Sequence, residues 1–556
     1  MRPKDPLSPI RVVALAAALA CGSACSEDAS GVPDAPQQTT CSVTGVSVTT
    51  GATHVGPGEN ATLTASVTSS GPCTGGVAWT ATPSGATLTP NGTQATFSAT
   101  TAGVYTIKAT STDDGTKSGG AMVTVATACG VANGVTVEHK TAITSNETWA
   151  GFGVTHLVSQ TIAIKAPATV TIEPCAIVVV AAGAEIDVTG DVTGNQTAKL
   201  VAAGTDDVTG FITVSPQMAG KPWGQIRGVN PLSLVELHHT TLKQGGGDET
   251  FHGNAPIEMN GPGDALPPVA VLTADHLTID RPVGSGVYLK GSSAFTDAST
   301  QLTVIGAADH PIRLAMMALA SIPPFVSMEN PIDDALVMGS TAYVFADLTI
   351  TNRIPVRIKD QTVVVAPPDG SSLPMVTLTV QPGATIRLEG GVSFSVGSVG
   401  GANRRIGRLL AVGDAAHPIR FTSGAATPAP GDWAGLYLYN ADGSKLDYVT
   451  VEYAGGFSGL ISTNCRPSGA GDVANIIIGS DAFIPPADMI THSVIQFSAG
   501  FGIDAVWSGP TFNAPNLTDP ANGNTFASNA RCDQSFNGLA AGSGLKCPSG
   551  GGCQPQ

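Results

Sequence analysis

An internal duplication constrains the fold of this chain more than any other feature of its sequence. Three pairs of segments match in the same order: TIEPCAIVVVAAGAEIDV from Thr171 with TVQPGATIRLEGGVSFSV from Thr379 (offset 208), KPWGQI at Trp223 with GDWAGL at Trp433 (offset 210), and HLTIDRPVGSGVYL from His276 with HSVIQFSAGFGIDAV from His492 (offset 216). Slowly rising offsets in a fixed order indicate two copies of one unit, with longer loops in the second copy.

A shorter repeat marks a corner in the predicted fold. GAADHPIR (306–313) and GDAAHPIR (413–420) share Gly and then His-Pro-Ile-Arg at the same spacing. Proline fixes φ and starts a strand, so we expect the isoleucine to point inward and the arginine outward. No further ligand recurs with the two histidines, which favours a packing role over metal binding.

The local pattern predicts short stacked strands. Apolar residues make up 42% of the chain and charged residues 12%, with 67 Gly and 39 Pro. Runs of four to six residues are broken by Gly, Pro or Asn, and none of the repeated segments keeps a helical period. One such rung cannot bury its apolar face alone, so the copies predict an all-β solenoid of parallel coils.

The series VTIEPCAIVVV, KPWGQI, LTVQPGATIRLEGG, GRLLAVGDAAHPIRFTS and PGDWAGLYL resembles the right-handed parallel β-helix repeat proteins of bacterial surfaces. The resemblance implies a pectin lyase-like, right-handed parallel β-helix at 129–535, with duplicated units at about 134–310 and 340–535. Cys175 stands where the second copy has Gly383, consistent with a disulfide to Cys129 that covers the first rung. Residues 536–556 are expected to form a Gly-rich, disulfide-stapled tail.

The region 41–128 predicts a separate β-sandwich, because about seven short alternating runs lie between turn signals. The stretch GVAWTATPSGATLTPNGTQATFSATTAGVYTIKATS resembles the bacterial immunoglobulin-like domains of surface proteins, with Trp79 as a core anchor and Tyr105 as a corner tyrosine. The resemblance implies a spacer or a recognition module, and a single copy favours the spacer.

The N-terminus predicts export. Residues 1–20 carry basic residues and then the apolar run VVALAAALA, as a signal peptide does. Cys21 ends a segment resembling a bacterial lipobox and is the expected lipid attachment site, with Cys25 as the alternative and ordinary cleavage after Ala20 as the other reading. Residues 21–40 are polar and predict a disordered tether. We therefore expect a lipid-anchored protein of the outer membrane or cell surface, or else a secreted one.

Cysteine usage agrees with an oxidising compartment. Eight cysteines follow the export region, an even number without metal-cluster spacing. Proximity in sequence suggests four disulfides: Cys41 with Cys73, Cys129 with Cys175, Cys465 with Cys532, and Cys547 with Cys553.

The sequence predicts no catalytic residues, no cofactor and no metal. Glycosidases need paired carboxylates, and the adjacent pairs are Asp113-Asp114, Asp206-Asp207 and Asp333-Asp334. Arg357-Ile358-Lys359 matches a triplet of polygalacturonases, whose other motifs are missing here. A net charge of −16 without a basic run excludes nucleic acid as a partner.

One polar cluster stands out within LVELHHTTLKQGGGDETFHGN. Its candidate residues are Glu236, His238, His239, Asp248, Glu249 and His252. Neighbours in a strand alternate faces, so we expect only one of His238 and His239 to share a site with the following loop. A solvated strand and loop is favoured over metal or catalytic use.

Aromatic candidates for a sugar-stacking platform are Trp223, Trp433, Tyr437, Tyr439 and Trp507. Trp223 and Trp433 occupy equivalent positions in the two copies, which favours a structural role for them.

These patterns together favour a non-catalytic surface protein with a structural, adhesive or glycan-binding role. Its expected partners are the outer membrane, through the lipid, and a polysaccharide or another surface protein. The alternative is a polysaccharide lyase or glycoside hydrolase acting on the β-helix face. A purely architectural role is the third reading, since a fold does not decide function.

Overall fold

The regular secondary structure of the described residues is almost all β-strand, which confirms the predicted all-β class. The computed structural model describes residues 40–52, 54–101, 103–125, 129–206, 210–247, 254–263, 266–339, 341–359, 362–368, 375–397, 405–456, 473–480, 485–508, 515–535, 538–539 and 545–546. Helical structure in these ranges is limited to two short 3-10 segments, η1 (Met316–Ser321) and η2 (Pro520–Asn522). Across the described part of the chain, no helix has the length and apolar character needed to cross a membrane.

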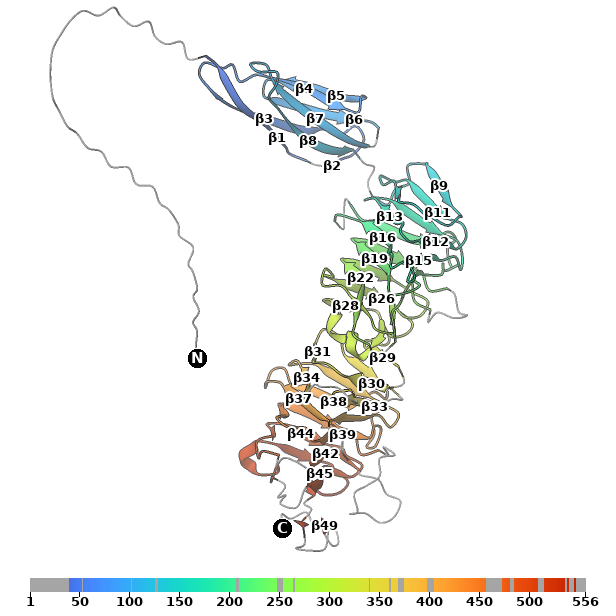
Figure 1. The fold of residues 1–556 in the computed structure, drawn as a ribbon, viewed down its shortest axis with the longest axis vertical. Helices are drawn as coiled ribbons and strands as arrows, with labels where there is room; N and C mark the ends of the chain where they lie inside the picture. The colour runs from blue at the N-terminus through green and yellow to red at the C-terminus, as the bar shows by residue number, and fades with distance from the viewer. Residues whose placement is uncertain are drawn as a thin grey trace, which may run out of the picture.

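Two four-stranded sheets form the N-terminal body (Figure 1). Their strand orders are β1 (Ser42–Thr50), β3 (Ala61–Ser70), β6 (Gln94–Ala99), β5 (Ala86–Asn91), and β2 (His54–Val55), β8 (Ser118–Val125), β7 (Gly103–Ser111), β4 (Val77–Thr82). All neighbours are antiparallel except β2 and β8. Alternate residues point inward, so Leu63 and Phe97 of one sheet meet Ile107 of the other in one core.

The two aromatic residues singled out in this body differ in their burial. Tyr105 is buried, and its hydroxyl donates to the Thr101 carbonyl at 3.0 Å. Trp79, predicted as a core anchor, is only half-buried at the core margin, which corrects that expectation. The reason is that β4 lies at the edge of its sheet, where fewer side chains can cover the indole. A disulfide joins Cys41 and Cys73, as predicted.

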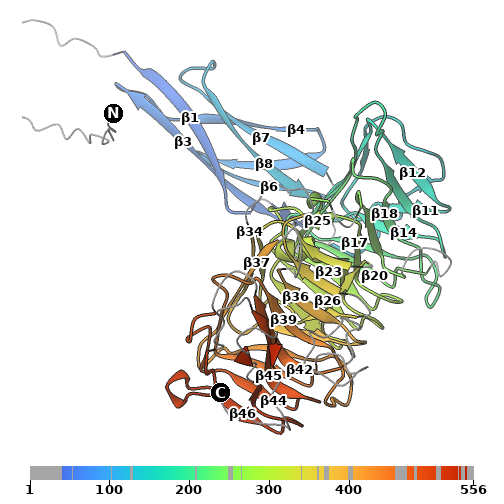
Figure 2. The same cartoon turned by 60° about the horizontal axis from the view of Figure 1, so that its bottom comes forward.

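From β9 to β47 the chain winds in coils, each strand pairing in parallel with strands of the neighbouring coils (Figures 1 and 2). Three sheets hold the first copy: an eight-stranded sheet of β28 (Phe325–Met328), β26 (Leu302–Ile305), β23 (Leu277–Asp280), β20 (Thr240–Lys243), β17 (Ile212–Pro216), β14 (Ile177–Val180), β11 (Thr155–Val158) and β9 (Thr136–His139); a six-stranded sheet of β10 (Glu147–Trp149), β13 (Thr169–Ile172), β16 (Ala198–Ala203), β19 (Ser233–His238), β22 (Val269–Asp275) and β25 (Ser293–Phe295); and part of a thirteen-stranded sheet. This arrangement fits a parallel β-helix solenoid.

Among the sheets of the described residues, only the thirteen-stranded sheet runs through both copies. It contains β12 (Ile162–Lys165), β15 (Ile186–Thr189), β18 (Ile226–Gly228), β21 (Ile257–Asn260), β24 (Val287–Lys290), β27 (Ile312–Ala315), β29 (Ala335–Met338), β32 (Val356–Ile358), β35 (Thr385–Leu388), β38 (Ile419–Ser423), β41 (Val449–Glu452), β44 (Val494–Gln496) and β46 (Thr525–Ala527). The repeated His-Pro-Ile-Arg corners open β27 and β38. Ile312 and Ile419 are buried and Arg420 is half exposed, as the repeat predicted.

Two further parallel sheets complete the second copy, and a small antiparallel pair follows them. The seven-stranded sheet has β30 (Thr341–Val344), β33 (Thr362–Val365), β36 (Ser393–Val396), β39 (Gly435–Tyr439), β42 (Ala474–Ser480), β45 (Phe501–Ser508) and β47 (Gln534–Ser535); the five-stranded sheet has β31 (Leu348–Ile350), β34 (Met375–Val380), β37 (Ile406–Val412), β40 (Lys445–Asp447) and β43 (Ile490–Thr491); the pair is β48 (Gly538–Leu539) with β49 (Leu545–Lys546).

The interior of the solenoid is a set of apolar columns, because every second strand residue points inward. One column joins residues paired in register from four successive coils: Val170, Leu200, Val235 and Leu272. All four are fully buried. Each coil therefore covers the apolar face of the next, as a solenoid requires.

The segment η1 marks the junction between the copies. It occupies the place of a strand between β27 and β28, and four of its residues, Met316 to Leu319, are buried. The eight- and six-stranded sheets end near it, and the seven- and five-stranded sheets begin after it. Met316, Met317 and Leu319 belong to the continuous apolar core, so the interior stays filled where the sheets break.

Matching strands of the two copies lie in different sheets. β18, which follows Trp223, belongs to the thirteen-stranded sheet, whereas β39, which follows Trp433, belongs to the seven-stranded sheet. The same shift separates β23 of the eight-stranded sheet from β44 of the thirteen-stranded sheet. The second copy is therefore out of step with the coils by one strand.

Left-handed corner residues confirm the match between these strands. Four hexapeptides begin and end with a non-glycine residue at positive φ: HTTLKQ (239–244), HLTIDR (276–281), YVTVEY (448–453) and HSVIQF (492–497). The first two enclose β20 and β23 in the eight-stranded sheet, and the last two enclose β41 and β44 in the thirteen-stranded sheet. Corner residues stack along the axis, as Tyr453 does on Phe497 with ring centroids 5.1 Å apart.

A buried aromatic cluster lies at the first coil. His139 and His156 are 8% and 2% exposed, and their rings join through Nε2 and Nδ1 at 3.0 Å. Trp149 stacks on both rings, at centroid distances of 4.1 and 5.2 Å. Nearby, a disulfide links Cys129 and Cys175 as predicted, and Cys175 has positive φ like the matching Gly383.

Acid is expected to open this end of the solenoid. Burial lowers the pKa of both His139 and His156 below the ordinary value of 6.5, although Glu147 acts in the opposite direction. As the pH falls, the unfolded segment therefore binds protons before the folded segment does. The stability of the folded segment is fully present above the ordinary pKa of 6.5 and decreases as the pH drops below it. Hydrogen exchange of amides in β9 to β12 should be slower at about pH 7 than at about pH 5, after correction for intrinsic rates.

The variant His139→Phe provides the control, because it keeps a ring on Trp149 and removes one titrating group. Its amides should show a smaller difference between the two pH values. Equal protection of the native protein at both pH values would contradict the assignment.

Candidate functional site

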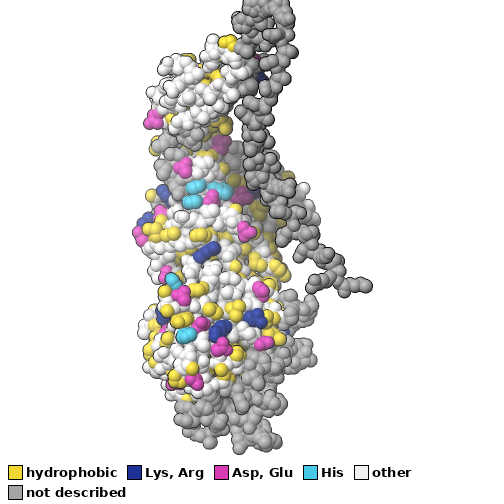
Figure 3. All heavy atoms as spheres, turned by 90° about the vertical axis from the view of Figure 1, so that its left-hand side faces the viewer, with side chains coloured by type: hydrophobic (Ala, Val, Ile, Leu, Met, Phe, Trp, Pro, Cys, Tyr) yellow, Lys and Arg dark blue, Asp and Glu magenta, His cyan; other side chains and the backbone are white. Residues whose placement is uncertain are grey.

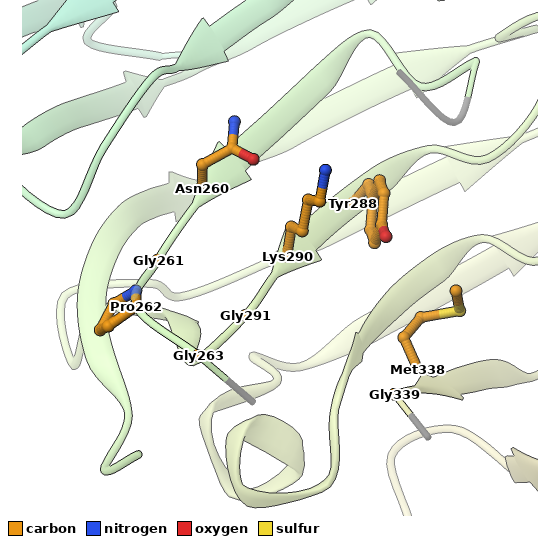
Figure 4. Close-up of a pocket in the computed structure, with 9 residues that line it drawn as sticks. All are labelled: Asn260, Gly261, Pro262, Gly263, Tyr288, Lys290, Gly291, Met338 and Gly339. Atoms are coloured by element: carbon orange, nitrogen blue, oxygen red, sulfur yellow. The ribbon is translucent and has the colours of Figure 1, made fainter. Parts of the chain in front are cut away.

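A hollow of about 500 Å³ lies on the outer face of the thirteen-stranded sheet. Its lining residues are Asn260, Gly261, Pro262, Gly263, Tyr288, Lys290, Gly291, Met338 and Gly339. Figure 4 shows Asn260, Lys290 and Tyr288 in a row on neighbouring strands, with Pro262 toward the Asn260 end of the row and Met338 toward the Tyr288 end. The hollow thus combines an amide, an ammonium group, a phenol and a thioether.

The local fold explains why this hollow exists. Asn260 and Lys290 end β21 and β24 and pair in register, so their side chains leave the same face. Ala315, whose small side chain is buried, pairs with Met338, and the chain after Ala315 turns into η1. The Asn260 amide is held in place because its Nδ2 donates to the Gly228 carbonyl at 3.0 Å.

A second hollow of about 510 Å³ lies further along the same sheet. Its charged lining includes His310, Asp333, Arg357, Lys359, Arg387 and Glu389. Beneath them, Asp334 is fully buried and accepts from His310 Nδ1 at 2.6 Å, Arg357 Nη2 at 2.8 Å and Arg387 Nη1 at 2.6 Å. Arg357 also pairs with Glu389, and Arg387 pairs with Asp333 at 2.6 Å.

This network keeps Asp334 ionised. Burial alone would raise its pKa, but hydrogen bonds from His310, Arg357 and Arg387 outweigh burial and hold the pKa well below its usual range. A general acid at neutral pH needs the opposite shift. The Arg357-Ile358-Lys359 triplet and the Asp333-Asp334 pair therefore belong to a charge-compensated framework.

The predicted polar cluster is partly present. Glu236 points outward and pairs with Lys199 at 2.7 Å. Asp275, at the end of β22, accepts from His238 Nδ1 at 2.9 Å and from His276 Nδ1 at 2.9 Å. Donor atoms of His239, Asp275 and His276 lie within 4.8 Å of one another. Asp248, Glu249 and His252 lie outside the described residues.

The expectation that His238 and His239 point to opposite faces is wrong at this position. β19 ends at His238, and His239 turns the chain with φ of 42°, so both side chains come near Asp275. Sequence reasoning missed Asp275 and His276. The available signal was the recurrence of HTTLKQ and HLTIDR at a spacing of 37 residues, which places His276 one coil beyond His239.

The remaining candidates have structural surroundings. Asp113 accepts from Thr74 Oγ1 at 2.8 Å and Asp114 accepts from the Thr116 amide at 2.9 Å, both within turns. Asp207 lies outside the described residues. Trp223, Trp433 and Tyr437 are fully buried and cannot form a solvent-facing platform. Tyr439 is half-buried, and the side chain of Trp507 is not among those described.

Two of the four predicted disulfides concern cysteines outside the described residues. Cys465, Cys547 and Cys553 fall there, so the pairs Cys465 with Cys532 and Cys547 with Cys553 stay predictions. The lipid-attachment candidates Cys21 and Cys25 also lie outside the described residues.

No protein-family model matches the chain. No curated protein matches its sequence.

Proposed function

We propose that this chain is a non-catalytic surface protein that binds a glycan in the hollow around Tyr288. The observation that carries the proposal is the row of Asn260, Tyr288 and Lys290 on adjacent strands, opposite Met338. Sugar hydroxyls form hydrogen bonds with amide and ammonium groups, and the apolar face of a sugar ring packs on an aromatic ring. The hollow offers all three groups in one concavity. A rigid sheet holds them in fixed positions, which reduces the entropic cost of binding.

The architecture proposed for this function has three parts. A lipid on Cys21, or on Cys25, anchors the chain; residues 41–128 form an immunoglobulin-like spacer; and a right-handed β-helix displays the hollow. The Tyr105 hydrogen bond to Thr101 supports the immunoglobulin-like assignment, and the strong handedness rule for parallel crossovers supports the right-handed coil. Fatty-acid labelling that persists in a Cys21→Ser/Cys25→Ser double variant would contradict the anchor.

Glycan binding is expected to depend on Tyr288. In a glycan-array screen followed by calorimetry, Tyr288→Ala should weaken binding by about tenfold or more, because loss of a central aromatic contact costs over about 1.4 kcal/mol. Tyr343→Ala is the matched control, since Tyr343 is 40% exposed and lies in β30 of another sheet.

Three outcomes would overturn the proposal. If the chain binds none of the glycans on the array, an architectural role is favoured over glycan binding. Equal loss in both tyrosine variants places the ligand elsewhere. Release of reducing ends or unsaturated products that disappears in Asp333→Ala or His239→Ala favours a polysaccharide-cleaving enzyme.

A further inference from the structure

We propose that His239, Asp275 and His276 form a binding site for a first-row divalent transition metal, with Zn²⁺ as the working probe. The site lies at the N-terminal ends of β20 and β23, at the corners that join the six-stranded sheet to the eight-stranded sheet. Gln244 and Arg281 are the corner residues at the other ends of these two strands. It is separate from the hollow around Tyr288 and does not depend on glycan binding.

The backbone brings the three residues together. His239 and His276 are equivalent corner residues one coil apart, with φ of 42° and 50°. Their rings stack at a centroid distance of 4.6 Å and an interplanar angle of 11°. Asp275 immediately precedes His276 and pairs in register with His238, which precedes His239. Two imidazoles and a carboxylate therefore meet at one corner.

The donor set matches a transition metal better than Ca²⁺ or Mg²⁺. Imidazole suits first-row transition metals such as Zn²⁺, Cu²⁺ and Ni²⁺, whereas Ca²⁺ and Mg²⁺ prefer oxygen ligands. Donor atoms within 4.8 Å of one another need only side-chain rotation to reach the separation of about 3.4 Å in a tetrahedral site with bonds near 2.1 Å. Both histidines are of intermediate exposure, so an ion and its remaining ligands have access from solvent.

Neighbouring groups prepare the carboxylate. Asp275 also accepts from Thr300 Oγ1 and from His238 Nδ1. Figure 3 shows histidine side chains gathered beside acidic side chains on one face of the solenoid.

The second copy shows which part of this arrangement the fold needs. At the matching corners Tyr448 stacks on His492 with ring centroids 4.8 Å apart, and Asp447 Oδ1 lies 2.8 Å from His492 Nδ1. A stacked aromatic pair beside an aspartate therefore suffices for the corner. In the stacked pair the first copy has a second imidazole, His239, where the second copy has Tyr448. Its aspartate also precedes the second ring (Asp275 before His276) instead of the first (Asp447 before Tyr448). The second imidazole is the group that makes metal chelation feasible.

The test uses the tag-free exported chain, with Zn²⁺ titrated by calorimetry and Co²⁺ by visible absorption. His239→Tyr copies the Tyr448 corner and should keep the melting temperature of the metal-free protein while weakening Zn²⁺ binding by about tenfold or more. His492→Ala is the matched control in the second copy and should bind as the unmodified chain does. X-ray absorption of the Zn²⁺-loaded chain should show two imidazole ligands.

The proposal fails if unmodified chain and His239→Tyr bind Zn²⁺ equally, if His492→Ala removes the binding, or if the absorption spectrum shows fewer than two imidazoles. Because the spectrum reads the unmodified chain, it decides the matter even if a variant does not fold.

Discussion

Replacing Asp334 with alanine is expected to destabilise the chain by about 3–5 kcal/mol, because removing one partner of a buried ionic network leaves the others uncompensated. Asp334 is fully buried between His310, Arg357 and Arg387. The free energy of unfolding in a urea titration measures the loss. The network stabilises the coils just after the junction, so exchange of amides in β29 to β35 should rise most.

The adjacent Asp333 gives a stringent control for this result. Its side chain is 56% exposed and pairs with Arg387 alone among the contacts described. Asp333→Ala should therefore cost less than about 1 kcal/mol, as exposed ion pairs do. A similar loss in both variants would show that the buried carboxylate has no special role.

Replacing Trp433 with alanine is expected to cost about 3–5 kcal/mol, because a fully buried indole leaves a large cavity. Trp433 has no exposed surface, and its Nε1 donates to the Glu452 carbonyl at 2.9 Å. Thermal and urea unfolding of Trp433→Ala measure the effect.

The variant Trp433→Phe separates the cost of the cavity from the cost of the lost hydrogen bond. It keeps an aromatic ring in the core and loses the donor, for which about 0.5–1.5 kcal/mol is expected. If Trp433→Ala kept its stability and lost only ligand binding, the indole would belong to a binding surface and the buried position would be wrong.

The repeated segments were sufficient to predict parallel coils, since strand-length apolar runs without a helical period can bury their faces only by stacking. They could not predict which sheet each strand joins. A match between the segments at Trp223 and Trp433 identifies equivalent strands, but sheet membership depends on how many strands lie between them, and η1 replaces one strand along the way.

The candidate sites were less accessible to prediction than the fold. His310, Asp334, Arg357 and Arg387 are each about a coil apart in sequence and meet only when the coils are in register. His238 and His239 illustrate a local failure, because alternation ends where the strand ends and His239 takes a left-handed conformation. The hollow around Tyr288 depends on the inward turn at η1, which has no signature in the repeat.

The one-strand displacement between the copies bears on how such a protein can grow. If a duplicated gene segment had to encode whole turns, few recombination points would yield a folded product. In this chain β39 lies a whole number of turns plus one strand beyond β18, when η1 is counted in the place of a strand. The unbroken thirteen-stranded sheet therefore contains strands from non-equivalent positions of the two copies. Crossover points at any strand boundary could therefore lengthen this molecule, provided that one sheet passes uninterrupted through the seam.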